Sequence, residues 1–305
     1  MVRGMKKPSL VILAAGIGSR YGGLKQVEPV GPSGEIILDY TLYDAWRAGF
    51  GKVVFVVQSQ HRRALDEHFR PALAGKLEIA FAYQRLDDLP PGFAVPADRK
   101  KPWGTGHAVY AARNTVSGPF AVANADDFYG RGSLEALAGF LGSPVRENEC
   151  CLVAFQLANT LSPHGSVSRG ICQVDGAGRL VSITERTRIE PAAGGGRYLD
   201  RAGRWRPLSG EEPVSMNLWG FSPALFRRLE AGFAGFLKEE ETDPKAEFQL
   251  PTVIDRLIRE GGWTCRVLPT AERWFGMTYR DDRDEVRREL GRLGEEGSYP
   301  EPLWG

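Results

Sequence analysis

The chain has 305 residues, of which 42% are hydrophobic and 25% are charged, and its formal net charge is +1. This length suits one elaborated domain or two closely packed lobes, and the composition is typical of a soluble globular protein. The nearly neutral charge argues against nucleic acid or an anionic membrane as a partner, and no segment is long and apolar enough to span a membrane.

The cysteines indicate the cellular compartment. Cys150, Cys151, Cys172 and Cys265 have no metal-ligand spacing, so we expect reduced, buried thiols in a cytoplasmic protein. The basic N-terminus and the apolar run at residues 10–15 imitate a signal peptide. That run has only six residues, however, and is shorter than an export core.

The run at residues 10–15 predicts a buried parallel strand, and a glycine-rich turn follows it. The turn and its surroundings contain Gly16, Gly18, Ser19, Arg20 and Lys25. Small residues let backbone N–H groups surround an anion, and the two cations add charge, so this segment predicts a phosphate-binding site. Tyr21 breaks the dinucleotide-binding motif, and Leu24 stands where the P-loop motif requires lysine.

The first half of the chain alternates between predicted strands and helices. A helix is expected at residues 38–48, and strands are expected at residues 52–58, 77–84 and 120–124. This alternation predicts an α/β fold with a doubly wound, largely parallel sheet. Ligands of such sheets bind beyond the carboxyl ends of the strands, where the glycine-rich turn and residues 124–127 both fall.

The second half has a different pattern. After an insertion at residues 85–103, expected to be a surface flap, strands are predicted at residues 151–157, 170–175, 180–184 and 215–221. The Gly- and Arg-rich residues 191–213 are expected to form a loop or an excursion from the fold. Helices are predicted at residues 223–236, 249–259 and 282–293.

The segment LAAGIGSR at residues 13–20, followed by Lys25, resembles the opening of the sugar-1-phosphate nucleotidylyltransferases. Five further segments resemble that family in the same order, and they are GTGHAV (104–109), VANADDFYG (122–130), SRGI (168–171), ITER (183–186) and EFQL (247–250). The GTGHAV and EFQL segments are most similar to the uridylyltransferases for glucose 1-phosphate and GlcNAc 1-phosphate.

The resemblance implies a Rossmann-like, doubly wound mixed sheet of the nucleotide-diphospho-sugar transferase type, with a sugar-binding second lobe. It implies one catalytic domain over residues 1–305. Within that domain, a nucleotide-binding half would span residues 8–130 and a sugar-phosphate-binding half residues 131–280. A C-terminal helix and tail would span residues 281–305.

The resemblance also implies roles for single residues. The expected nucleotide-binding residues are Ala14, Ala15, Gly16, Gly18, Ser19, Gln84, Gly104, Thr105 and Gly106. The expected catalytic residues are Arg20, Lys25 and Asp126, of which Asp126 would also bind Mg²⁺. The expected sugar-phosphate-binding residues are Gly170, Glu185, Arg186, Asn217 and Glu247. Gly276 stands where the family has a second metal ligand, Asp or Asn, and Asp281 and Asp282 follow it.

Asp126 and Asp127 form an acidic pair at the end of the predicted strand 120–124. Two adjacent carboxylates repel each other unless a cation is near, so the pair itself indicates a metal site. Side chains alternate along a strand, so only one of the two can face the phosphates, and the family resemblance implies that it is Asp126. His107, in the GTGHAV segment, is expected to make a structural hydrogen bond.

The predicted activity is nucleotidyl transfer from an NTP, with UTP or dTTP favoured, to a sugar 1-phosphate, with release of pyrophosphate. Two other hypotheses are open at this point. The first is a cytidylyltransferase acting on a non-sugar phosphate such as phosphocholine. The second is a non-catalytic protein that binds nucleotide sugars on the same fold.

Overall fold

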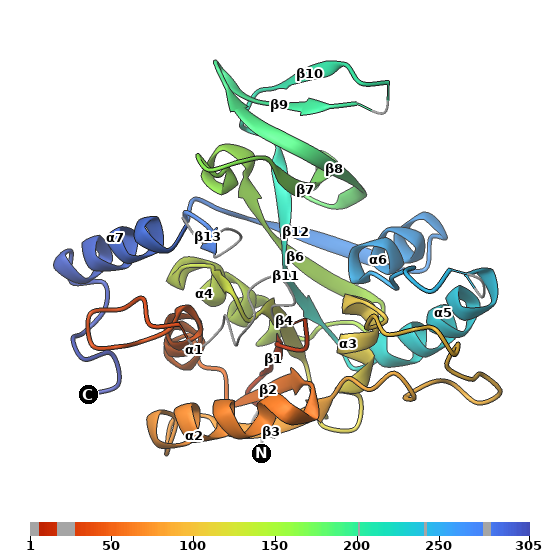
Figure 1. Ribbon diagram of the computed structural model, residues 1–305, viewed down its shortest axis with the longest axis horizontal. Helices are drawn as coiled ribbons and strands as arrows, with labels where there is room; N and C mark the ends of the chain where they lie inside the picture. Colours follow the sequence, from red (N-terminus) through yellow and green to blue (C-terminus); the bar gives the residue numbers. More distant parts are fainter. Residues whose placement is uncertain (1–5, 17–27, 201, 241–242, 277–281) are drawn as a thin grey trace.

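The structure is a computed structural model that describes residues 6–16, 28–200, 202–240, 243–276 and 282–305. Its centre is a mixed sheet with the strand order β10-β9-β8-β7-β11-β4-β1-β2-β3, and β6 and β12 continue the sheet beside β11 (Figure 1). A second, two-stranded sheet consists of β5 (Asp127–Phe128) and β13 (Phe275–Gly276).

The N-terminal part of the main sheet is parallel. Its strands are β1 (Ser9–Leu13), β2 (Lys52–Val57), β3 (Glu78–Tyr83) and β4 (Phe120–Asn124). β1 lies between β2 and β4, so that Leu13 is opposite both Val56 and Asn124. These inner strands are buried on both faces, which explains their continuous apolar sequences. The arrangement confirms the doubly wound fold predicted for this half.

Helices cover both faces of the sheet, as Figure 1 shows. The helices that contribute to the core on one face are α1 (Ile37–Arg47), α2 (Arg62–Ala72) and α4 (Arg131–Leu141). Those on the other face are α3 (Thr105–Ala111), α5 (Leu225–Glu239) and α6 (Leu250–Arg259). Each helix turns an apolar stripe toward the sheet, so the sheet is buried between two hydrophobic cores.

The C-terminal part of the sheet is mainly antiparallel, so the whole sheet is mixed, as the family resemblance implied. Its strands are β6 (Glu149–Gln156), β7 (Val167–Val174), β8 (Leu180–Ala192), β9 (Gly195–Leu199), β10 (Trp205–Leu208), β11 (Pro213–Phe221) and β12 (Thr264–Thr270). Only the β6–β12 pair in this part is parallel among the described strands.

Residues 191–213 form an excursion that consists of paired strands and not a loop. β8 continues to Ala192 and turns back into β9 and β10, which form the antiparallel extension at the top of Figure 1. Gly195 makes this turn possible because its φ is +136° and a Cβ there would lie 2.3 Å from the backbone of Ser209. The glycines that suggested a loop therefore belong to a strand connection.

β11 connects the two parts of the sheet. One edge of β11 pairs with β6, while the other edge pairs first with β7 at Val214 and Ser215 and then with β4 from Trp219 to Phe221. Between these pairings the register shifts by a bulge. The sheet therefore forks at the bulge, and β4 and β7 separate on its two sides.

The last described residues pack back onto α1. α7 (Asp282–Glu295) is followed by Tyr299 and Leu303, which join a hydrophobic cluster with α1, β5 and β13. The Tyr299 hydroxyl donates to Asp44 at 2.7 Å, and the Trp304 indole donates to Asp39 at 2.8 Å. The tail thus contributes to the core of the N-terminal half.

Among the described residues, no helix has both the length and the apolar character needed to cross a membrane.

Candidate functional site

The fork in the sheet opens into two cavities that meet at the end of β4 and at the bulge of β11. Asn124, Asp126 and Asn217 line both of them. The larger cavity, of about 590 Å³, extends from these residues to the end of β1 and to Gln84. The smaller one, of about 300 Å³, extends to β7 and β8. Both lie beyond the carboxyl ends of the parallel strands, where open α/β sheets bind ligands.

The two adjacent carboxylates have different environments. Asp127 is buried and accepts hydrogen bonds from Asn124 Nδ2 at 2.8 Å and from the Tyr129 hydroxyl at 3.2 Å. Burial, together with the nearby Asp126 carboxylate, raises the pKa of Asp127 to about 7. Asp126 is only half-buried and borders both cavities. Asp126 is therefore the more accessible of the two carboxylates at the junction.

Asn217 connects the two branches of the fork. Its Nδ2 donates to Asn124 Oδ1 at 2.7 Å, and its Oδ1 accepts from the Trp219 indole at 3.0 Å. Its backbone has a φ of +61°, a left-handed conformation that asparagine tolerates better than most residues. A chain of hydrogen bonds therefore runs from Trp219 through Asn217 and Asn124 to Asp127, and it fixes the strand end that carries Asp126.

Near Gln84, the wall of the larger cavity is formed where Gly104 and Gly106 lie close to Phe248. Gly104 has a φ of +101°, and a Cβ there would lie 2.8 Å from the carbonyl oxygen of Phe248. Gly106 donates its backbone N–H to the same oxygen at 2.9 Å. Thr105 also belongs to this wall, and its hydroxyl accepts from the backbone N–H of Leu250 at 3.0 Å. Glycine is thus required here by packing within the protein.

Gln84 and the Gly104 segment are adjacent despite the insertion at residues 85–103. Gln84 Nε2 lies 3.0 Å from the Gly104 carbonyl oxygen and 3.2 Å from His107 Nδ1. The insertion is held against α3, because the Asp88 carbonyl contacts His107 Nε2 at 2.9 Å and the Asp88 carboxylate pairs with Arg113. His107 is buried, which lowers its pKa, and it has the structural hydrogen bonds that the sequence analysis expected.

The smaller cavity is lined by both hydrogen-bond donors and acceptors. Gly170 of β7 is paired with Glu185 of β8, and a Cβ at Gly170 would lie 2.9 Å from Ile183. Partial desolvation of the Glu185 carboxylate raises its pKa, and Arg169 opposes this effect. Arg169 and Trp274, neither of which the sequence analysis had selected, complete the wall.

Two expected sugar-phosphate residues lie elsewhere. Arg186 points away from both cavities described above, and its guanidinium lies 4.6 Å from the centre of the Tyr198 ring. Successive side chains of β8 point to opposite faces of the sheet. Because Glu185 faces the smaller cavity, its neighbour Arg186 faces away from it. Of the two cavities at Asp126, Glu247 borders the larger one, and it forms an ion pair with Lys101 at 3.0 Å.

The glycine-rich turn is described only at its start. Ala14 and Ala15 are buried, the Ala15 carbonyl accepts from Gln58 Nε2 at 3.0 Å, and Gly16 borders the larger cavity. Gly18, Ser19, Arg20 and Lys25 lie outside the described residues, and so does Asp281. The predictions made for these five residues stay predictions.

The described residues fit a metal ion only if the substrate completes its coordination. They contain no group of three His, Cys, Asp or Glu side chains that could hold one. A Cβ at Gly276 would lie 2.8 Å from Asp127 Oδ1 and 2.9 Å from the Asp126 carbonyl oxygen, so no side chain fits there. Asp282 borders a third cavity, of about 30 Å³. Asp126 with phosphate oxygens would still suit Mg²⁺, which usually has few protein ligands.

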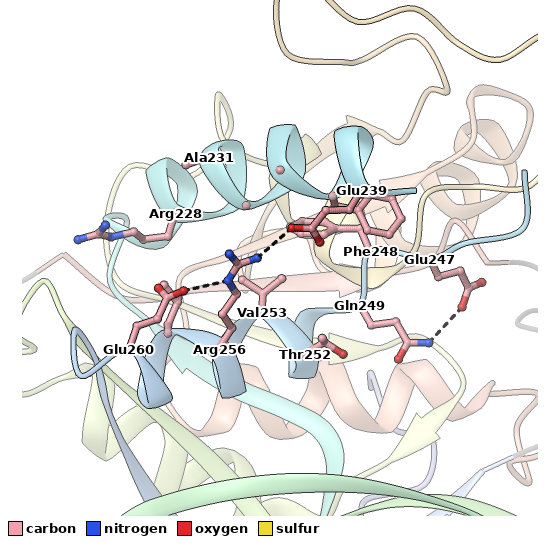
Figure 2. Close-up of a pocket in the computed structure, with 14 residues that line it drawn as sticks. Arg228, Ala231, Glu239, Glu247, Phe248, Gln249, Thr252, Val253, Arg256 and Glu260 are labelled. Carbon is pink, nitrogen blue, oxygen red and sulfur yellow. Dashed lines mark hydrogen bonds and ion pairs between the residues drawn. The ribbon is translucent and has the colours of Figure 1, made fainter. Parts of the chain in front are cut away.

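A further groove of about 290 Å³ lies between α5 and α6 (Figure 2). Its rim carries Arg256, which pairs with Glu260 at 2.9 Å and Glu239 at 3.9 Å, as the dashed lines in Figure 2 show. Its floor is mainly apolar and includes Phe248. These internal ion pairs and the apolar floor make the groove unsuited to phosphates.

A mixed α/β sheet with a large cavity at the carboxyl ends of its parallel strands has the architecture of a nucleotide-binding enzyme. Comparison with known proteins supports this class. The nucleotidyl transferase family matches residues 9–234. The UTP--glucose-1-phosphate uridylyltransferase of Bacillus subtilis (strain 168) is 31% identical over 306 aligned positions, which cover 94% of this chain and 89% of that protein.

Two solved structures have the same fold. The inositol-1-phosphate CTP transferase from T. maritima superposes with a TM-score of 0.62 at 13% identity, over 96% of this chain and 97% of that one. A UDP-glucose pyrophosphorylase complexed with UDP-glucose gives a TM-score of 0.61 at 14% identity, over 94% and 99%. The chain belongs to the nucleotidyl transferase family and is a nucleotidyltransferase, which confirms the family resemblance seen in its sequence.

Proposed function

We propose that the chain transfers a nucleotidyl group from a nucleoside triphosphate to a sugar 1-phosphate and releases pyrophosphate. The observation that carries this proposal is the meeting of two differently lined cavities at Asp126. Nucleotidyl transfer requires two phosphate-bearing substrates to meet end to end in a fixed orientation. The name of the Bacillus subtilis relative contains a substrate pair of this kind, UTP and glucose 1-phosphate.

In the proposed reaction, an oxygen of the sugar phosphate attacks the α-phosphorus of the triphosphate. A new phosphorus–oxygen bond forms, and the bond from the α-phosphorus to the departing pyrophosphate breaks. The attacking phosphate needs no general base, because the second pKa of a phosphate monoester is about 6. The protein must instead align two anions that repel each other and stabilise the charge of the pyrophosphate.

Each part of the site has a proposed task in this reaction. Arg20, Lys25 and the backbone N–H groups of residues 16–19 hold the triphosphate. Gly170, Glu185 and Asn217 border the sugar phosphate. Asp126 holds Mg²⁺, which when bound neutralises charge on the phosphates. Arg186 is not part of this proposal, because its side chain lies over Tyr198.

The preference for UTP or dTTP is proposed from Gln84. Its Nε2 is engaged with Gly104 and His107, and among the described residues no donor contacts its Oε1. A carbonyl oxygen on this wall would accept a hydrogen bond from the N3–H of uracil or thymine. Cytosine has no N3–H, so we expect CTP to bind more weakly.

The proposal is tested by measuring pyrophosphate release for all four NTPs, and dTTP, against common sugar 1-phosphates, inositol 1-phosphate and phosphocholine. We expect turnover only with a sugar 1-phosphate, and the highest kcat/KM with UTP or dTTP. Turnover with CTP and a non-sugar phosphate would favour the cytidylyltransferase hypothesis instead. Binding of nucleotide sugars without any pyrophosphate release would contradict the proposal.

A further inference from the structure

The chain is anchored on both sides of the glycine-rich turn. Before the turn, Gln58 Nε2 donates to the Ala15 carbonyl at 3.0 Å. After the turn, Glu28 and Pro29 are the first described residues, and both of them contact α7. A helix distant in the sequence therefore holds the segment that follows the turn.

Two arginines of α7 make these contacts. Arg283 Nη1 lies 3.0 Å from the Glu28 carboxylate, and Arg287 Nη2 donates to the Pro29 carbonyl at 3.1 Å. The two arginines are four residues apart in α7, so they lie on the same side of the helix. The side chains of Arg283 and Glu28 are 40% and 29% exposed, and exposed ion pairs contribute little to stability. These contacts are better suited to orienting the segment than to stabilising the fold.

The hydrophobic cluster beneath α7 connects this segment with the acidic pair. Val30, directly after the two contacted residues, is buried in the cluster together with Val286 of α7. Phe128, which follows Asp127, belongs to the same cluster, and its ring stacks on Phe275 at 4.3 Å. α7 therefore packs on two segments that adjoin proposed phosphate-binding residues.

We infer that α7 positions the glycine-rich turn for the NTP, and that Arg283 and Arg287 are positioning residues that act through Glu28 and Pro29. A loop that binds a ligand loses conformational freedom, and this loss is smaller when the ends of the loop are already placed. The two arginines border neither cavity at Asp126. The inference rests on the proposed function and deepens it by adding residues that act from outside those cavities.

A purely structural role is the competing explanation, in which the two arginines only attach α7 to the protein. The helix has other attachments, however. Val286 and Leu290 are buried in the hydrophobic cluster, and Arg273 pairs with Glu285 at 2.7 Å and Glu289 at 2.6 Å. Loss of the two arginine contacts should therefore leave α7 in place, so that a change in NTP binding reports on the turn.

The main test is the double variant Arg283→Gln with Arg287→Gln. We expect the Kd for UTP, measured by calorimetry with Mg²⁺, to rise about 4- to 25-fold, because each contact contributes about 2- to 5-fold. The Kd for sugar 1-phosphate and the midpoint of urea unfolding should equal those of the wild type. Arg288→Gln is the matched control, since its Nε donates to the Asp284 carbonyl within α7. Its Kd for UTP should be unchanged.

A second variant separates positioning from the simple loss of positive charge near the triphosphate. Glu28→Gln removes a negative charge, so an effect of charge alone would lower the Kd for UTP. Loss of the contact with Arg283 would instead raise it, and we expect a rise of about 2- to 5-fold. Exchange of the two charges, by Glu28→Arg together with Arg283→Glu, should restore the wild-type Kd.

An unchanged Kd for UTP in the folded double variant, or a lower Kd in Glu28→Gln, would overturn the inference. The expected changes in Kd without pyrophosphate release by the wild type would contradict the proposed function but not the positioning role. Absence of UTP binding by the wild type would contradict both. In active protein, kcat/KM for UTP should fall in the double variant while KM for the sugar 1-phosphate is unchanged.

Discussion

Isosteric substitution can distinguish the roles of Asp126 and Asp127, the two adjacent carboxylates after β4. We expect Asp126→Asn to lower kcat by about a hundredfold or more, because it removes the negative charge that would hold Mg²⁺ at the phosphates. We expect Asp127→Asn to lower stability more than turnover, because Asp127 is buried and accepts from Asn124 and Tyr129. Turnover across a magnesium titration, with urea unfolding of both variants, measures the two effects.

The reverse result would identify a different metal ligand. If Asp127→Asn abolished turnover at every magnesium concentration while Asp126→Asn did not, the carboxylate facing the phosphates would be Asp127. Asp88→Asn is a suitable control for loss of a carboxylate elsewhere, because Asp88 pairs with Arg113 outside both cavities.

Lys25 is the residue of the glycine-rich turn with the clearest expected role. We expect Lys25→Ala to leave the fold intact and to lower kcat by about a hundredfold or more, because the proposed role of this lysine is to neutralise charge on the phosphates. Circular dichroism and steady-state kinetics test this expectation. Lys238→Ala, at the end of α5, is a control for the loss of a lysine charge. A kcat near that of the wild type would disprove the role.

A backbone motif in the sequence indicates where the fold needs glycine, but it does not indicate which side chains border a cavity after packing. Gly104 and Gly106 were identified from a motif, and the structure shows that each approaches Phe248 too closely for a Cβ. The family motif indicates Arg186, whereas the structure places Arg169 at the smaller cavity. The two arginines are opposite each other across β7 and β8, and only burial decides which borders the cavity. Burial of that kind is not visible in a local sequence pattern.

The bulge in β11 offers a test that separates backbone conformation from side-chain hydrogen bonding. Asn217→Gly and Asn217→Ala both remove the amide that contacts Asn124 and Trp219. Only alanine is also strained by a φ of +61°, so we expect it to be less stable than the glycine variant by about 1 kcal/mol. Urea unfolding measures this difference. Equal stability of the two variants would show that the bulge relaxes.

Substitutions of Gly276 in β13 test whether this strand could carry a second metal ligand. Because a Cβ there would clash with Asp127 and the Asp126 backbone, we expect Gly276→Ala to destabilise the protein by about 1–3 kcal/mol. Gly276→Asp should likewise lose stability without gaining metal affinity. Gly291→Ala is the control: nothing lies within 4 Å of its Cβ position in α7, and alanine there should stabilise the helix by about 0.5–1 kcal/mol. Tighter metal binding by Gly276→Asp would contradict this account.

Elements were predictable where the local sequence alone determines them. The predicted strand at residues 120–124 has the bounds of β4, and the predicted helix at residues 249–259 differs from α6 by one residue. β9 and β10 were not predicted, because they are short, rich in Gly and Arg, and paired only with each other and β8. Both strands lack the buried apolar pattern on which strand prediction depends.

The packing of the tail on α1 makes the stability of the protein depend on pH. Asp44 is buried, and burial raises its pKa from 3.8 to about 7. The native state therefore retains this proton up to about pH 7, whereas the unfolded chain loses it near pH 4. Between these values the native state binds more protons, so the free energy of unfolding should fall as pH rises, by up to about 1.4 kcal/mol per pH unit.

Urea unfolding between pH 5 and pH 8 measures this slope. We expect Asp44→Asn to flatten it in part, and the raised pKa of Asp127 to account for a remaining slope of the same sign. Asp200→Asn is the control, because hydrogen bonds lower the pKa of Asp200 to about 2, outside this pH range. A slope that Asp44→Asn leaves unchanged would show that Asp44 is ionised in the native protein.

The fork at β11 also limits how substrates can enter and leave. One edge of β11 is bonded to β6, and the other is bonded to β7 and β4 in turn, so a single strand belongs to both halves of the molecule. Hinge motion requires a few connecting residues that can change conformation without breaking a sheet. The paired strands at this crossing provide no such hinge. We therefore expect substrate and product to exchange without the two parts of the sheet swinging apart like a clamshell.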